Sequence, residues 1–107
     1  MAQVNKNLVA IDENITLDIP TDATAVVGVQ YGVGGLGTIV LEGSMDAGAS
    51  WFTIQLLKPD GTAAVLLLAA AGQGYADVSY CDRVRVRKSV AGAGGVLVGV
   101  NLATRAA

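Results

Sequence analysis

Hydrophobic and polar residues alternate along most of this chain. Residues 15–19 read Ile-Thr-Leu-Asp-Ile, residues 83–87 read Arg-Val-Arg-Val-Arg, and residues 96–102 carry Val or Leu at every second position. Alternation puts apolar side chains on one face of a β-strand, whereas an amphipathic helix repeats about every 3.6 residues. The pattern predicts about eight strands. They cover residues 15–19, 24–31, 38–44, 51–57, 63–68, 75–80, 83–90 and 96–102.

Turn signals between these segments indicate the fold class. Residues 59–62 read Pro-Asp-Gly-Thr, a strong turn signal, because Pro presets φ and Gly accepts a positive φ. Short strands spaced by about 8–12 residues are typical of sandwiches and barrels. We therefore expect an all-β fold, an antiparallel β-sandwich with either jelly-roll or immunoglobulin-like strand order. The Ala and Leu residues of 63–68 also suit a helix, but the segment is short and lies between turns, which favours a buried strand.

The alternation is weak at the start of the chain. Residues 1–13 are predicted to form an N-terminal arm or a frayed first strand. Residues 14–107 are expected to form a single β-sandwich domain, because a chain of 107 residues is too short for two domains with proper cores.

Composition indicates self-association. Hydrophobic residues make up 52% of the chain and charged residues only 15%, against about 25% charged in a typical soluble domain. Part of the apolar excess is Ala, and the remainder suggests faces covered by other subunits. The sequence therefore predicts a homo-oligomer, with a trimer favoured.

Charge and residue usage argue against several classes of function. The net charge of −2 disfavours a nucleic-acid partner, and the apolar run at 63–71 is far shorter than the roughly 20 residues that span a bilayer. We expect no secretory signal, since no positively charged segment followed by an apolar one stands in the sequence, and with a single cysteine, Cys81, we expect synthesis in a cytoplasm. It has no histidine, which removes the commonest general base and metal ligand. We expect no enzymatic activity, no metal and no cofactor.

Residues 44–51, Ser-Met-Asp-Ala-Gly-Ala-Ser-Trp, form the sharpest motif. They resemble the Asp-box of sialidases, S-x-D-x-G-x-[ST]-W, which is a structural hairpin in that family. Asp46 is expected to bind turn amides with Ser44 beside it, Gly48 to take a left-handed conformation and Trp51 to fold over the turn. The motif occurs once, so a structural turn is favoured over glycosidase activity. Glycoside hydrolysis would also need two facing carboxylates in a cleft.

Four of the seven basic residues lie together in Arg83, Arg85, Arg87 and Lys88. A period of two places the three arginines on one face of a strand. One interpretation is a solvated face whose arginines pair with acidic residues of a neighbouring strand. The alternative is a docking stripe for an acidic partner surface, and direct contact with nucleic acid is a third, weaker possibility.

The aromatic residues are Tyr31, Trp51, Phe52, Tyr75 and Tyr80. They could form a stacking platform for sugars. However, Tyr75 and Tyr80 are an odd number of residues apart and would point to opposite faces of a regular strand, so core or interface packing is favoured. A cluster of exposed aromatics on one face would instead favour carbohydrate binding.

The order of these motifs resembles small β-sandwich virion proteins of tailed bacteriophages, including head-decoration (cement) and tail-associated proteins. The resemblance is carried by residues 25–30, 37–46, Trp51, 74–78, 83–87 and the final Gly-containing strand. It implies a structural protein of the virion without enzymatic activity, made in the host cytoplasm.

The role expected from this resemblance is a capsid decoration or cement protein that stabilises the head. Its partners would be the major capsid protein or other virion proteins. The alternative is a host-binding, carbohydrate-binding module on the surface of the tail or capsid.

Overall fold

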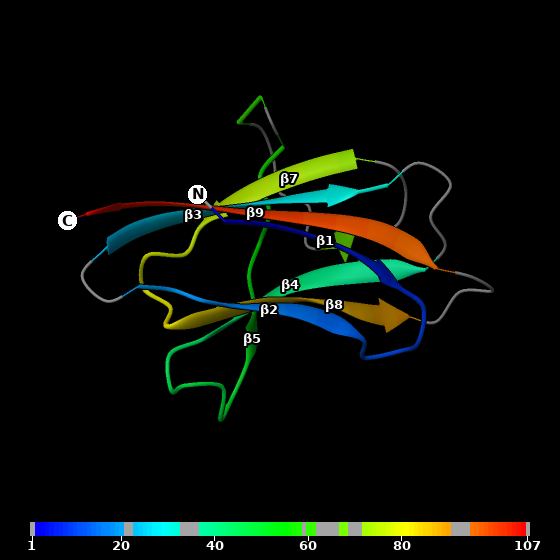
Figure 1. The fold of residues 1–107 in the computed structure, drawn as a ribbon, viewed down its shortest axis with the longest axis horizontal. Helices are drawn as coiled ribbons and strands as arrows, with labels where there is room; N and C mark the ends of the chain where they lie inside the picture. The colour runs from blue at the N-terminus through cyan, green and yellow to red at the C-terminus, as the bar shows by residue number, and fades with distance from the viewer. Residues whose placement is uncertain are drawn as a thin grey trace.

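The computed structural model describes residues 2–20, 23–32, 37–58, 60–61, 67–68, 72–90 and 95–106. Within these residues every regular element is a β-strand, and every strand pair is antiparallel. The strands are β1 (Ala2–Leu8), β2 (Asn14–Asp18), β3 (Ala23–Tyr31), β4 (Thr38–Ser44), β5 (Phe52–Thr53), β6 (Leu67–Leu68), β7 (Gly72–Asp77), β8 (Arg83–Val90) and β9 (Val96–Ala106). They form two facing layers (Figure 1). The predicted all-β antiparallel sandwich is confirmed.

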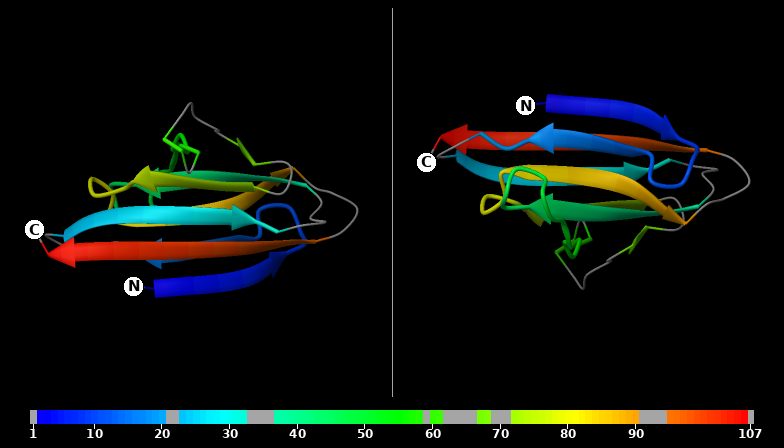
Figure 2. Two further views of the ribbon diagram at one scale, coloured as in Figure 1. Left: turned by 90° about the horizontal axis from the view of Figure 1, so that it is seen from above. Right: turned by 90° about the horizontal axis from the view of Figure 1, so that it is seen from below.

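The strand order identifies a jelly roll. One sheet has the order β1-β9-β3-β7, and the other has the order β2-β8-β4-β5 with the short β6 also paired to β4. Figure 2 shows the four-stranded sheet from its outer side in the left view and the five-stranded sheet in the right view. Apart from the β4–β5 hairpin and the short β6, successive strands alternate between the sheets. This interleaving is the double Greek key of a jelly roll, not the immunoglobulin order.

The core lies between the sheets and follows the alternation of the sequence. Inward-facing residues of β3 and β9 are almost fully buried, and Val84 and Val86 of β8 face them from the other sheet. The inward set on β3 and β9 comprises Ala25, Val27, Val29, Tyr31, Val96, Val98, Val100 and Leu102. Full burial of one such aliphatic side chain contributes about 1.5–3 kcal/mol, so these strands dominate the stability of the domain.

The prediction of an N-terminal arm is wrong for Ala2–Leu8. This segment forms β1, an edge strand that pairs with β9 from Ala2↔Leu102 to Leu8↔Val96. Leu8 is fully buried and Val4 packs against the core. Its Asn and Lys residues are poor strand formers, so local propensity is low and pairing with β9 decides the conformation. The sequence left two interpretations open, an N-terminal arm and a frayed first strand of the sheet, and the structure shows a strand.

The predicted strand at 51–57 is divided between the two sheets. Only Phe52–Thr53 pair with β4, and Leu57 instead forms a bridge with Tyr75 of β7. Ile54 and Leu56 are buried as the chain passes from one layer to the other (Figure 1). Of the predicted strand at 63–68, Leu67–Leu68 form β6, while 63–66 lie outside the described residues. The predicted strand at 75–80 is shifted, since β7 spans Gly72–Asp77.

Candidate functional site

The 44–51 turn connects β4 to β5 and is held by its own polar side chains. The Ser44 hydroxyl donates to Asp46 Oδ1 at 2.7 Å and accepts the Gly48 amide at 2.8 Å. Asp46 also accepts the Ser50 amide at 2.9 Å and the Ser50 hydroxyl at 2.5 Å. These hydrogen bonds, led by those from Ser50, lower the pKa of Asp46 to about 2. The Asp46 carboxylate is therefore a charged acceptor at the centre of the turn at neutral pH.

Backbone conformation and a neighbouring segment complete this turn. Ala47 and Gly48 have positive φ values of 60° and 91°, and the second position favours glycine. The Ala47 amide donates to Asp82 Oδ2 at 2.8 Å, and Arg83 Nη1 donates to the Ala47 carbonyl at 2.7 Å. The 44–51 turn is thus fastened to residues 82–83, which lead into β8.

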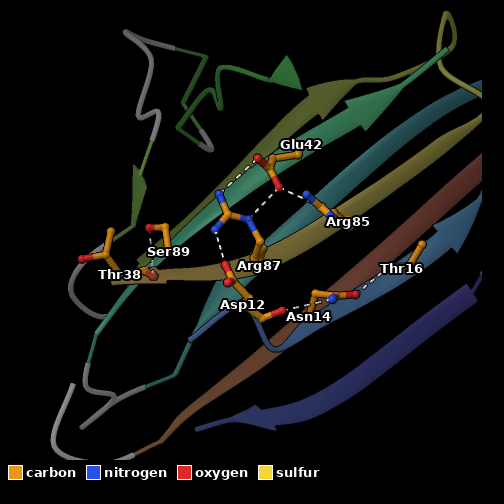
Figure 3. Close-up of polar contacts among 8 residues, drawn as sticks. All are labelled: Asp12, Asn14, Thr16, Thr38, Glu42, Arg85, Arg87 and Ser89. Atoms are coloured by element: carbon orange, nitrogen blue, oxygen red, sulfur yellow. Dashed lines mark hydrogen bonds and ion pairs between the residues drawn. The ribbon is translucent and has the colours of Figure 1, made fainter. Parts of the chain in front are cut away.

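The outer face of the five-stranded sheet carries a network of charges around Glu42. Arg85 Nε and Arg87 Nε donate to Glu42 Oε1 at 2.8 and 2.9 Å, and Arg87 Nη1 donates to Asp12 at 2.8 Å (Figure 3). Register explains the geometry, since Glu42 of β4 lies directly opposite Arg85 of β8. The three arginines do share one face, and Arg85 and Arg87 pair with acids of neighbouring segments.

The Glu42 carboxylate is stabilised in its charged form. Its side chain is only 10% exposed, and burial alone would raise its pKa. Hydrogen bonds from Arg87 and Arg85 outweigh burial and hold the pKa of Glu42 below its ordinary value. The hydrogen bond to Glu42 likewise raises the pKa of Arg87, with a further contribution from Asp12. Each partner therefore keeps the other ionised.

Lys88 does not belong to this face, and its prediction as a docking residue is wrong. Its position on β8 has inward parity, and the residue is fully buried. The Nζ atom donates to the carbonyls of Val9 at 2.8 Å and Leu8 at 3.5 Å. Lys88 thus fastens the end of β1 from inside the sandwich, where a partner cannot reach it.

Trp51 is half-buried and lies on the same outer face of the five-stranded sheet as Glu42, Arg85 and Arg87, which we call the charged face. Its ring is covered by the Arg85 guanidinium, whose carbon lies 4.2 Å from the ring centroid. The indole also lies beside Gly48, where an added Cβ would approach Trp51 Cζ2 to 3.5 Å. Trp51 does fold over the turn as the motif predicts. The role of Ser44, Asp46, Gly48 and Trp51 as a structural unit stays a prediction.

A second turn at residues 78–82 lies beside the first. The Asp82 amide donates to the Ser44 carbonyl at 2.9 Å, and Tyr80 stacks on Phe52 with centroids 6.0 Å apart. Both turns lie at the same end of the sandwich (Figure 1). We call this surface the turn end and define it by its accessible large side chains, Met45, Trp51, Tyr80 and Arg83.

The sequence alone did not single out Met45, and for Tyr80 it favoured packing in the core or at an interface. Met45 is 64% exposed and Tyr80 is 56% exposed, values that are high for apolar side chains. Each stands inside a turn, where the alternation that separates core from surface no longer applies. The sequence places Met45 in the 44–51 turn, but it predicts Tyr80 at the end of the strand at 75–80, which β7 does not reach.

Reactive groups are few in the described part of the chain. Cys81 is buried, and burial, followed by the charges of Asp82 and Asp77, raises the pKa of its thiol. This disfavours the thiolate, which is the reactive form. Among the described residues no three His, Cys, Asp or Glu side chains are grouped so as to hold a metal ion. Nor does that part of the chain contain a helix long and apolar enough to span a membrane.

Comparisons with known proteins reveal similarity in fold. Neither a protein-family model nor a curated protein matches the sequence. Among solved structures, the SPBc2 prophage-derived protein YomS is similar, with a TM-score of 0.66 and 9% identity over 97% of this chain and 94% of that one. The Drosophila NLP core aligns over 96% of this chain and 99% of its own, with a TM-score of 0.48 and 14% identity. At these identities the likeness to YomS shows a shared fold.

Proposed function

We propose that this protein is a non-enzymatic structural protein of a bacteriophage particle, a decoration or cement subunit on the outside of the capsid. The observation that carries the proposal is the fold shared with the prophage-derived YomS along almost the whole of both chains. The resemblance of its strands and motifs to small phage virion proteins supports the same class. A rigid sandwich suits this role because it bridges neighbouring capsid subunits through contacts alone.

The turn end is the surface that we assign to attachment. Protein interfaces are enriched in Tyr, Trp, Met and Arg, and these are the residue types at Met45, Trp51, Tyr80 and Arg83. The hydrogen bonds of Asp46 hold the turn in one conformation, which reduces the entropy lost on binding. Arg83 is the most exposed arginine of the stripe, at 43% of its side chain. Its ion pair with Asp18 is largely exposed to solvent and therefore weak, so an acidic partner surface can engage Arg83 at little cost.

Arg85 and Arg87 are less suited to docking than the sequence suggested. Their charges are matched by Glu42 and Asp12, and about a quarter of each side chain is exposed. A partner would have to break these ion pairs to engage them, which offsets the gain. Of the three arginines, we therefore assign only Arg83 to docking.

Self-association is the second part of the proposal. Val9 and Ile11 in the β1–β2 connection and Leu97 on β9 are each more than half exposed. This apolar surface, together with the low fraction of charged residues, supports a homo-oligomer, for which we favour a trimer. Sedimentation equilibrium at micromolar concentration should give about three times the chain mass, and a stable monomer would contradict this part.

Particle fractionation tests the function. Particles from the strain that carries the gene are separated on a density gradient, and an antibody against the purified protein is applied to the fractions. We expect the protein with filled heads. Its presence only with tails would overturn the decoration role, and its absence from all particle fractions would overturn the virion class.

Variants then test the assigned surface. Tyr80→Ala and Met45→Ala should each weaken attachment of the recombinant protein to particles that lack it. The matched control is Val26→Ala, which removes an exposed apolar side chain on β3 that belongs neither to the turn end nor to the surface assigned to self-association. Equal attachment of all three variants and the parent protein would place the interface elsewhere.

A further inference from the structure

The outer face of the four-stranded sheet carries an open hollow of about 330 Å³. It lies across all four strands, and the left view of Figure 2 looks onto this sheet. Its polar lining comes from Gln3 on β1, Asn101 on β9, Gln30 on β3, and Gln73 and Tyr75 on β7. None of the residues that line it is charged. This surface differs from both the turn end and the charged face.

Strand register arranges the lining in two adjacent rows. The first runs Gln3, Asn101, Gly28, Tyr75, and the second runs Gly99, Gln30, Gln73, with Asn5 of β1 opposite Gly99 beyond the lining. Neighbouring strands are about 4.8 Å apart, so each row brings two amide side chains close together, Gln3 and Asn101 in the first and Gln30 and Gln73 in the second. Glycine forms the floor in both rows. A Cβ added at Gly28 would have no atom closer than 3.9 Å, so the space above it is open.

The amide side chains of this face have no internal role in the described part of the chain. The side chains of Gln3, Asn5, Gln30, Gln73 and Asn101 make no hydrogen bond or ion pair with another described residue. All five are exposed. Asn is depleted in strands and glycine weakens them, so the composition is unfavourable for a sheet that needs only to fold. These residues therefore indicate a surface selected for contact with something outside the chain.

We propose that this hollow binds a neutral polysaccharide. Carboxamides donate and accept hydrogen bonds at once, which matches the hydroxyl groups of sugars. Tyr75 at the edge offers an apolar ring against which a sugar can pack. Charged side chains on the same face lie outside the hollow, where Asp77 is engaged by Ser79 and Arg105 stands near the end of β9. The uncharged lining thus selects an uncharged ligand.

The same observations disfavour other ligands. Nucleic acids and anionic polysaccharides require cationic side chains, and the lining has none. A protein interface would be expected to have an apolar centre with aromatic, Met or Arg anchors, which this hollow lacks apart from Tyr75. The proposal is independent of attachment to a particle, because the residues that line the hollow are different from those of the turn end.

Affinity electrophoresis tests the proposal with the intact protein. Native gels contain dextran, galactomannan, xylan or the anionic polysaccharide alginate, each in a separate gel. We expect at least one neutral polysaccharide to retard the protein, without effect of added salt. Gln30→Ala and Asn101→Ala should each weaken this binding about tenfold, the loss expected for one or two hydrogen bonds. Gly28→Val should abolish it, because the side chain fills the hollow.

Controls separate binding from folding and from self-association. Gln55→Ala removes an equally exposed carboxamide outside the four-stranded sheet and should leave retardation unchanged. Every variant is checked by thermal melting and by sedimentation. The proposal is overturned if no neutral polysaccharide retards the protein, if alginate alone does, or if Gly28→Val binds like the parent. It is also overturned if Gly28→Val changes only the oligomeric state, which would make this face a contact between copies.

Discussion

The outer faces of the two sheets are both formed by the polar positions of alternating strands, but one face carries paired charges and the other carries uncharged amides. On the five-stranded sheet, Arg85, Arg87 and Glu42 pair with one another and with Asp12. On the four-stranded sheet, carboxamides such as Gln30 line a hollow without partners among the described residues. Polar groups that satisfy each other contribute to stability, whereas groups that remain unsatisfied at the surface are available to a ligand. Substitutions on the two faces should therefore affect different measurements.

The largest effect on stability is expected from Glu42→Ala. This change leaves Arg85 and Arg87 without their shared acceptor while both stay three-quarters buried. Breaking a fully buried pair costs about 3–5 kcal/mol, and partial solvation of the arginines reduces this to about 2–3 kcal/mol. Urea denaturation measures the loss. Asp18→Ala, which removes the 84%-exposed partner of Arg83, is the control and should change the midpoint far less. Equal effects of the two variants would show that the ion pairs of Glu42 stabilise the fold no more than an exposed ion pair does.

Trp51→Ala should cost about 2 kcal/mol. A fully buried Trp costs about 3–5 kcal/mol, but Trp51 is half-buried and loses mainly its stacking with Arg85 and its packing on the 44–51 turn. Thermal melting checks the value. Trp51→Phe keeps an aromatic ring under Arg85 and should restore most of the loss. An unchanged melting temperature combined with lost particle attachment would make Trp51 a contact residue instead of a structural one.

Acid should destabilise the charge network around Glu42 and the 44–51 turn. The folded-state pKa values of Glu42 and Asp46 lie below their unfolded values, that of Asp46 at about 2. Their contribution is complete above the unfolded pKa, near 4, and is lost as pH falls toward the folded pKa. Melting temperature should therefore fall between about pH 5 and pH 2. Glu42→Gln and Asp46→Asn should each flatten this fall, and unchanged profiles would contradict the assignment.

The smallest effect on stability is expected on the four-stranded sheet. Gln30→Ala and Asn101→Ala should change the free energy of unfolding by less than about 0.5 kcal/mol, the usual range for surface positions. Gly28→Val should be neutral or stabilising, since Val favours strands and open space lies above Gly28. Urea denaturation of the three variants checks this. A loss comparable to that of Glu42→Ala would mean that the hollow is structural.

The sequence by itself determined the type of each main strand and the chemistry of the 44–51 turn. Alternation is a local property, so Val27, Val86 and Val98 could be assigned to the core without knowledge of their neighbours. The hydrogen bonds of the Asp46 side chain reach Ser44 and Ser50, which lie within the residues of the motif. Local pattern failed where pairing overrides propensity, as in β1, and where the chain crosses between layers, as at Ile54–Leu57.

Only the tertiary structure decided which residues meet across the sheets. Glu42 and Arg87 are 45 residues apart, and Lys88 and Leu8 are 80 apart, so no local pattern predicts either contact. The alternation predicts that Lys88 points inward, whereas its charge predicts an exposed side chain. The tertiary structure decides for the interior, because the carbonyls of Val9 and Leu8 accept hydrogen bonds from the Lys88 ammonium group. The hollow likewise exists only because β1, β9, β3 and β7 lie in that order. Strand order depends on packing between distant segments. The alternation in the sequence shows which face of each strand is buried, but not which strands become neighbours.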